Sequence, residues 1–242
     1  MSTTRTGMGG NSEISLQLSA FDQKRLYLIF EDARTMKLTE DTIENLASQY
    51  RADTAKIPPE IKKAADFQLC SLCPGKNTDG LCFALQPVLP FINDIDKYVS
   101  YDKVTAIYRD DEALLHVAYS TMQEALQYIS ILGLIHYCRV GRQYRKYFIG
   151  VVPIAGSEET VRRIYLNMYW IHKGNQNEIH SLIERFKSDI VSTSANQIKR
   201  LQLLCKNDAF INTFYNAQVA TEILSMDMES ALKQLFSASD TE

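Results

Sequence analysis

Three of the five cysteines in this 242-residue chain lie within thirteen residues, spaced Cys-x2-Cys-x8-Cys at Cys70, Cys73 and Cys82. The segment between them is rich in turn-forming residues, so the backbone can return the third cysteine to the first two. Two thiolates from one tight turn can bind the same ion or cluster. The pattern therefore predicts a metal site whose fourth ligand comes from elsewhere in the chain.

We expect Cys138 to be the fourth ligand, with His136 as the substitute. Cys138 follows an apolar run, residues 125–137, whose helical spacing would bury one face against the domain. Four-cysteine clusters and tetrahedral zinc sites often take their last ligand from a distant part of the chain. The alternative is that Cys138 is an ordinary buried helix residue. Cys205 lies among leucines without a partner pattern, which indicates core packing.

The residue types favour an iron–sulfur cluster over zinc. Pro74 directly follows Cys73, as in iron–sulfur loops, where proline helps to exclude water. Zinc accepts the same Cys-x2-Cys step, but its usual second pair is also closely spaced, whereas here a gap of eight residues leads to a single cysteine. The remaining alternative is three half-buried free thiols in a loop, since free cysteine behaves as a small apolar residue.

A basic segment, residues 139–147, follows the candidate fourth ligand. It could bind nucleic acid or a nucleotide, because cations pair with phosphates and tyrosine rings stack on bases. The alternative is a solvated helix end, since cations are favourable at a helix C-terminus. If the metal is present, its state could set the position of this segment. The cations are Arg139, Arg142, Arg145 and Lys146, and the tyrosines are Tyr144 and Tyr147.

The elements that must position these residues can be predicted from periodicity and end signals. Thr39 can cap a helix that begins near Glu40, Thr121 and Glu124 match a capping box, and Pro58-Pro59 disfavours helix in the connection 51–60. Alternating runs predict antiparallel strands at residues 14–18, 24–30, 35–38, 103–109 and 114–119. Helical spacing marks the later part of 83–99 and residues 121–138, 157–170, 177–191, 196–205, 208–224 and 227–236, the segment 196–205 either continuing the helix before it or forming a new one.

The predicted fold class is therefore α+β, with antiparallel hairpins and a cysteine-rich loop in the N-terminal half and helices in the C-terminal half. Residues 1–12 are small and polar and are expected to be a disordered leader. Residues 13–150 would form the α+β cysteine-site region, and the helical region 151–242 would pack on it in one continuous domain.

The order of hairpin, Cys-x2-Cys-Pro, further cysteine, second hairpin and apolar helix ending near a cysteine resembles an uncharacterised bacterial family known only as a domain of unknown function. The resemblance covers most of the chain and implies that Cys70, Cys73, Cys82 and Cys138 act together. In that group the last cysteine tends to lie in a Gly-Cys-Pro context, whereas here Arg139 follows Cys138. The resemblance implies no activity.

Composition narrows the function classes. A net charge of −3 gives no overall basic field, and no stretch is apolar enough to span a bilayer, so a cytoplasmic protein without membrane contact is expected. Phosphate-cradling glycine loops, nucleophile elbows and zinc-protease motifs are absent, which leaves an enzyme unsupported. The leading expectation is a redox or oxygen sensor, or an electron-transfer protein. The alternatives are a zinc-stapled module that binds an unknown protein partner and a Cys-x-x-Cys thiol redox enzyme.

Overall fold

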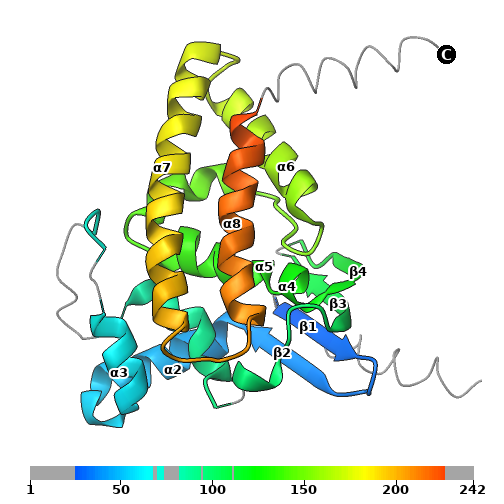
Figure 1. Ribbon diagram of the computed structural model, residues 1–242. Coiled ribbons are helices and arrows are strands. Elements are labelled where there is room, and N and C mark those ends of the chain that lie inside the picture. Colours follow the sequence, from blue (N-terminus) through cyan, green and yellow to red (C-terminus); the bar gives the residue numbers. More distant parts are fainter. Residues whose placement is uncertain (1–24, 68–69, 74–81, 94, 111, 227–242) are drawn as a thin grey trace, which may run out of the picture.

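The computed structural model describes residues 25–67, 70–73, 82–93, 95–110 and 112–226. A four-stranded antiparallel sheet lies in the N-terminal half and the C-terminal half is mostly helical (Figure 1), so the predicted α+β class is confirmed. The expected leader 1–12, the strand 14–18 and the helix 227–236 lie outside the described residues.

The sheet has the strand order β2-β1-β3-β4 and is antiparallel throughout. Its strands are β1 (Arg25–Phe30), β2 (Thr35–Thr39), β3 (Lys103–Arg109) and β4 (Leu115–Thr121), which confirms both predicted hairpins within that range. Alternate residues of β1 and β3 are buried in the core, among them Leu26, Leu28, Val104 and Ala106. The two-residue period that predicted the strands thus also selects the face that packs on the helices.

Helix α2 (Glu40–Ala52) begins where its cap predicts, because the Thr39 hydroxyl accepts a hydrogen bond from the Thr42 amide at 3.2 Å. The connection that follows is more helical than expected. It contains a 3₁₀ turn, η1 (Thr54–Lys56), and the helix α3 (Pro59–Asp66). Pro59 occupies the first helical position, whose amide would make no hydrogen bond within the helix. Proline is therefore tolerated there, and the proline pair starts this helix.

The segment after Cys82 also differs from the structure that the sequence predicts. A 3₁₀ helix, η2 (Phe83–Phe91), contains both prolines, and the described residues of the later part hold only the short 3₁₀ turn η3 (Ile95–Lys97). The regular helix expected in the later part of 83–99 is therefore wrong. Pro87 and Pro90 lie three residues apart, which fits a helix of three residues per turn.

The predicted capping box is present, since the Thr121 amide donates to Glu124 Oε2 at 2.9 Å. The helix after it is divided into α4 (Met122–Ala125), α5 (Gln127–Ile131) and a π-helical segment, η4 (Leu132–Tyr137). Cys138 caps the C-terminus of η4 with extended backbone. A π-helical turn at such a point is uncommon and is often found at functional sites.

Three long helices complete the fold: α6 (Ser157–Ile171), α7 (Gln176–Leu201) and α8 (Ala209–Ser225). Helices α7 and α8 lie side by side, and α8 also packs on α4, α5 and α6 (Figure 1). The segment 196–205 therefore continues α7 to Leu201. Within α6, Tyr165 is buried, whereas Trp170 is 78% exposed.

Buried side chains from the sheet, from η4 and from α6 to α8 belong to one hydrophobic core. The sheet and the helical half therefore share their interior. A search of the described residues finds no helix that is long and apolar enough to cross a membrane.

Candidate metal centre

The structure brings the four predicted cysteines to one pocket. Cys70, Cys73, Cys82 and Cys138 all line it, together with side chains of α7. Cys70 and Cys73 belong to one turn, in which the Cys73 amide donates to the Cys70 carbonyl at 2.9 Å. Cys138 reaches the pocket from the end of η4, as its place after the apolar run predicts.

The other two candidates do not line this pocket. His136 lines a different pocket, next to His116 and Arg145. Cys205 is buried in the core and its thiol donates to the Leu201 carbonyl at 3.1 Å, so its predicted packing role is confirmed. Cys138 is thus the better placed of the two proposed fourth ligands.

Helix α7 supplies a polar wall that the sequence reading did not identify. The buried residues on one face of α7 are spaced alternately four and three positions apart. In the first half of the helix they are apolar: Ile179, Ile183, Phe186 and Ile190. The same face continues as polar residues, which are also buried: Thr193, Gln197 and Arg200. Polar residues that continue an apolar helix face are a signal in the sequence from which these three residues could have been identified.

Two residues of this wall and the neighbouring Asn196 donate hydrogen bonds to the thiols. Asn196 Nδ2 lies 3.3 Å from Cys70 Sγ, and Gln197 Nε2 lies 3.6 Å from Cys82 Sγ. Arg200 Nη1 lies 3.2 Å from the same Cys82 sulfur. Hydrogen bonds from N–H donors are stronger to a sulfur that carries negative charge, as a sulfur does when it binds a metal.

The electrostatics of the pocket combine partly buried thiols with cations. Burial raises the pKa of the Cys138 thiol, the backbone amides of Gly141 and Val140 oppose that shift, and the nearby Cys82 and Cys70 add to it. Arg200 is only 1% exposed, and its Nε also donates to the Phe67 carbonyl at 3.1 Å. Arg139 lines the same pocket, with its guanidinium 5.0 Å from the centre of the Phe83 ring. Two guanidinium groups can therefore offset negative charge that develops on the sulfurs.

Two glycines allow the backbone to close around Cys138. A Cβ at Gly133 would lie 2.6 Å from the Ala84 carbonyl oxygen, so η4 can approach η2 only with glycine there. A Cβ at Gly141 would lie 1.6 Å from the Leu134 carbonyl oxygen. Both contacts are shorter than van der Waals separation, so the position of Cys138 beside Cys82 depends on these glycines.

The thiols surround the pocket without converging on one point. Within the described residues, no group of three or more His, Cys, Asp or Glu side chains is arranged to hold a metal ion. The free space inside the pocket is about 30 Å³, which exceeds the roughly 10–15 Å³ that one water needs. Four cysteines are the ligand set of iron–sulfur clusters and of structural zinc sites, so the donor set fits either group.

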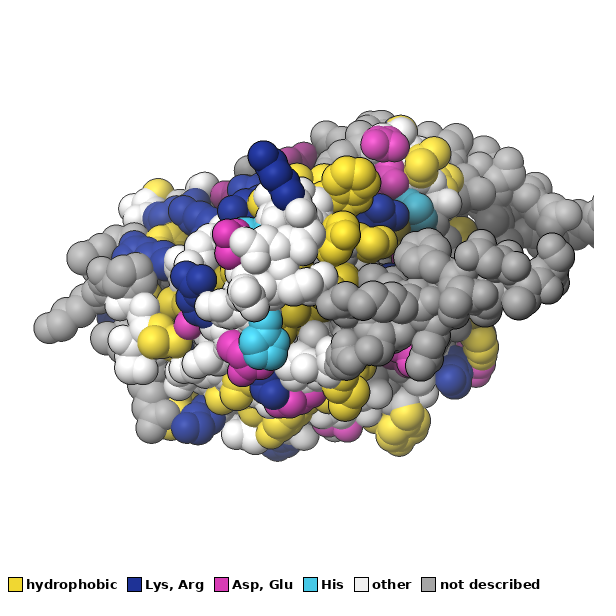
Figure 2. Space-filling model, turned by 90° about the horizontal axis from the view of Figure 1, so that it is seen from above, with side chains coloured by type: hydrophobic (Ala, Val, Ile, Leu, Met, Phe, Trp, Pro, Cys, Tyr) yellow, Lys and Arg dark blue, Asp and Glu magenta, His cyan; other side chains and the backbone are white. Residues whose placement is uncertain are grey.

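The basic segment 139–147 is split among several surfaces. Most of it forms a 3₁₀ helix, η5 (Gly141–Phe148), whose period of three buries Gly141, Tyr144 and Tyr147. The two tyrosines pack in the core, so the expected stacking on bases is wrong. Arg139 lines the cysteine pocket, Arg145 and Lys146 line two other pockets, and Arg142 is exposed. On the face in Figure 2, charged side chains of both signs are interspersed with apolar ones.

Comparison with known proteins gives one match. A family model described as "Domain of unknown function (DUF6901)" matches residues 27–239. Neither the curated proteins nor the solved structures contain a match to the chain.

Proposed function

This chain belongs to the DUF6901 family, whose description assigns no activity, and from its own side chains we propose that it is an iron–sulfur protein. The ligands are Cys70, Cys73, Cys82 and Cys138. The observation that carries the proposal is that these four thiols, spread over 69 residues of sequence, line one pocket while the fifth cysteine is packed elsewhere.

The arrangement of the thiols supports a cluster more than a zinc ion. A single zinc needs every sulfur within about 2.3 Å of one point. In a four-iron cluster the cysteines bind different irons, so the thiols lie around the group. All four cysteines line one pocket, as a group bound from several sides requires. An assembled cluster is larger than the free space of about 30 Å³, so the lining side chains must move when it binds.

The surroundings of the thiols support a redox role. Hydrogen bonds to the sulfurs, net charge and solvent access set the reduction potential of such a cluster. Asn196, Gln197 and Arg200 supply the hydrogen bonds, and the guanidinium groups of Arg139 and Arg200 supply positive charge. These contacts favour the reduced state of the cluster, which carries more negative charge than the oxidised state.

The accessibility of the thiols fits sensing or electron transfer. Cys70, Cys73, Cys82 and Cys138 are all partly exposed, so oxygen or a redox partner can approach the site. An iron–sulfur cluster supplies one-electron transfer and sensitivity to oxidants. The chain's own residues hold the group, orient its ligands and tune its charge.

Reconstitution of single cysteine variants with iron and sulfide tests the ligand set. We expect Cys138→Ser to lose most of the visible absorption that the wild-type protein gains, because serine oxygen is a poor substitute for thiolate at iron. Cys205→Ser is the matched control and should reconstitute fully, and His136→Ala should as well. Equal reconstitution of Cys138→Ser and Cys205→Ser would refute the proposed ligand set.

A further inference from the structure

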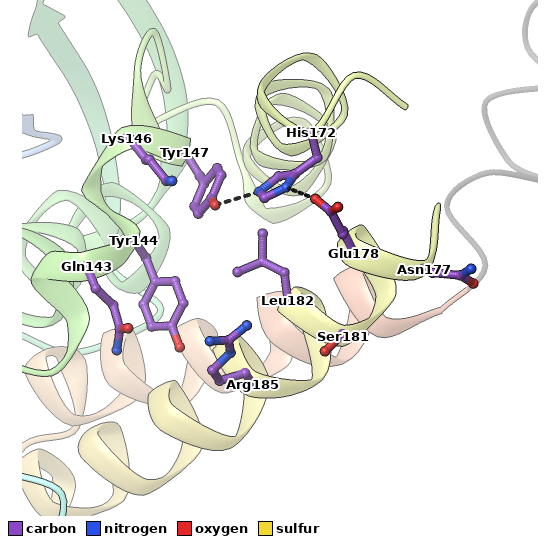
Figure 3. A pocket seen from close by; sticks show the side chains of 10 residues that line it. All are labelled: Gln143, Tyr144, Lys146, Tyr147, His172, Asn177, Glu178, Ser181, Leu182 and Arg185. Carbon is purple, nitrogen blue, oxygen red and sulfur yellow. Dashed lines mark hydrogen bonds and ion pairs between the residues drawn. The ribbon is translucent and has the colours of Figure 1, made fainter. Parts of the chain in front are cut away.

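A second pocket lies at the opposite end of α7 from the cysteine site. Its volume is about 530 Å³, within the range of small-molecule sites. Residues of η5 and of the first turns of α7 line it, and His172 closes it from the end of α6 (Figure 3). Arg185 and Arg200 are separated by fifteen residues of one helix, or about 22 Å along its axis, so the two sites are distinct.

One wall of the pocket is a chain of hydrogen bonds. The Tyr147 hydroxyl lies 2.9 Å from His172 Nε2, and His172 Nδ1 lies 2.9 Å from Glu178 Oε2 (Figure 3). With Glu178 accepting from Nδ1–H, neutral His172 accepts from the Tyr147 hydroxyl. A hydroxyl hydrogen can rotate, so Tyr147 can also donate to a ligand oxygen when it gives up its bond to His172.

The negative groups at this site are already paired. Glu178 Oε2 is bound to His172, and its Oε1 accepts from Asn175 Nδ2 at 2.8 Å. Below the pocket, Asp189 Oδ2 accepts from the Tyr144 hydroxyl at 2.6 Å and from Gln143 Nε2 at 3.2 Å. Both carboxylates thus have hydrogen-bond partners other than Arg185 and Lys146.

The two cations of the pocket have no carboxylate partner among the described residues. Arg185 extends into the space beside Tyr144 and Leu182 (Figure 3), and Lys146 lies 5.0 Å from the centre of the Tyr147 ring. Within the part of the chain that the structure describes, neither Arg185 nor Lys146 has a hydrogen bond or an ion pair with a carboxylate. The pocket therefore presents the unused donors of two cations to whatever enters it.

The geometry points to a binding site for a small molecule that carries a phosphate group, with Arg185 and Lys146 as its cationic contacts. A phosphate ester carries about −1.5 to −2 charges, which matches two cations better than a single carboxylate does. The Tyr147 hydroxyl can reach a further phosphate oxygen. The pocket is larger than the ion alone, so it has room for an organic body beside the phosphate. This inference does not depend on the cysteine site.

Titration of the full-length protein with three probes at constant ionic strength tests the site, with binding followed by calorimetry and by protein NMR. The probes are inorganic phosphate, ribose 5-phosphate and acetate. We expect ribose 5-phosphate to bind most tightly, inorganic phosphate more weakly, and acetate not measurably. Shifts should include the side-chain resonances of His172.

Arg185→Ala should weaken ribose 5-phosphate binding about tenfold or more, and Tyr147→Phe should weaken it several-fold. Arg162→Ala removes the same charge from α6, where Arg162 pairs with Glu159, and should leave binding unchanged. Arg185 is exposed, so its variant should fold, which thermal unfolding would verify. Absence of ribose 5-phosphate binding, acetate binding of equal strength, or equal effects of Arg185→Ala and Arg162→Ala would each overturn the inference.

Discussion

Arg200 of α7 donates a hydrogen bond from Nη1 to Cys82 Sγ over 3.2 Å, although the two residues are 118 positions apart in the sequence. The guanidinium is almost completely buried and also binds the Phe67 carbonyl. A buried charge is stable only with hydrogen-bond partners and compensating charge. The contact therefore links the helical half of the protein to the cysteine segment and prepares the pocket for negatively charged sulfur.

Replacement of Arg200 tests this link. Arg200→Met should lower the free energy of unfolding by about 2–3 kcal/mol, because the Phe67 carbonyl and the Cys82 sulfur lose a charged donor. It should also reduce the amount of cluster that the protein retains. Urea unfolding and iron analysis give the two values. The control is Arg142→Met, at an exposed arginine of η5, for which we expect a change within about 0.5 kcal/mol. Similar effects of the two substitutions would contradict the assigned role of Arg200.

The Asn196 amide should tune the reduction potential of the cluster. Its Nδ2 lies 3.3 Å from Cys70 Sγ, and such a bond favours the reduced state, in which the sulfur carries more negative charge. Asn196→Ala should therefore make the potential more negative while the cluster content stays near that of the wild type. Redox titration in the visible range measures the shift, with Asn216→Ala on α8 as the control. A potential that does not move would show that this contact has no influence on the site.

Close backbone packing at Gly141 should make this position intolerant of any side chain. Gly141→Ala places a Cβ 1.6 Å from the Leu134 carbonyl oxygen and should cost about 3 kcal/mol or more. Gly150 has a φ of +69° but open space around its Cα, so Gly150→Ala should cost only about 1–2 kcal/mol. Thermal unfolding of both variants compares the two effects. A Gly141→Ala protein as stable as Gly150→Ala would rule out the close approach.

Asp208, at the start of α8, should make the stability of the protein depend on pH in the acidic range. Burial raises the pKa of Asp208, but hydrogen bonds from the Ser100 amide at 3.0 Å and hydroxyl at 2.8 Å outweigh it, so the net pKa is lowered. A lowered pKa in the folded state gives stability that is present above the unfolded value of about 3.9 and is lost as pH falls through the folded value.

Asp208→Asn removes this titration and provides the test. The difference in free energy of unfolding between the wild type and Asp208→Asn should be largest near pH 6 and shrink toward about pH 2. Urea unfolding at several pH values measures it, with Ser100→Ala as a variant that should show the same trend. A difference that stays constant over this range would exclude Asp208 as a source of acid sensitivity.

Local sequence signals correctly predicted the helix starts and strands whose formation depends on residues close together in the sequence. Thr39 caps α2, the pair Thr121 and Glu124 forms a capping box, and alternation marked β1 to β4. Proline-containing segments were less predictable, because Pro59 starts a helix whereas Pro87 and Pro90 lie inside a 3₁₀ helix. Proline restricts the backbone, but its position relative to the helix start decides its effect.

The cysteine residues of the candidate site could be predicted, but not their surroundings. Cysteine spacing selected Cys70, Cys73 and Cys82, and the end of an apolar run selected Cys138. The contacts of Asn196 and Arg200 join residues more than one hundred positions apart, so no local pattern contains them. The pocket at His172 also joins separate elements, since Tyr147 of η5 and Glu178 of α7 both contact His172 at the end of α6.

Iron, sulfide and zinc analysis of the protein purified without oxygen, alongside Cys73→Ser, tests the central claim most directly. We predict stoichiometric iron and sulfide in the wild type, with a brown visible absorption that disappears in the variant. Stoichiometric zinc without colour would contradict the cluster and leave a structural staple at the same four cysteines. A metal-free protein with a reversible disulfide between Cys70 and Cys73 would contradict it as well and identify a thiol redox site.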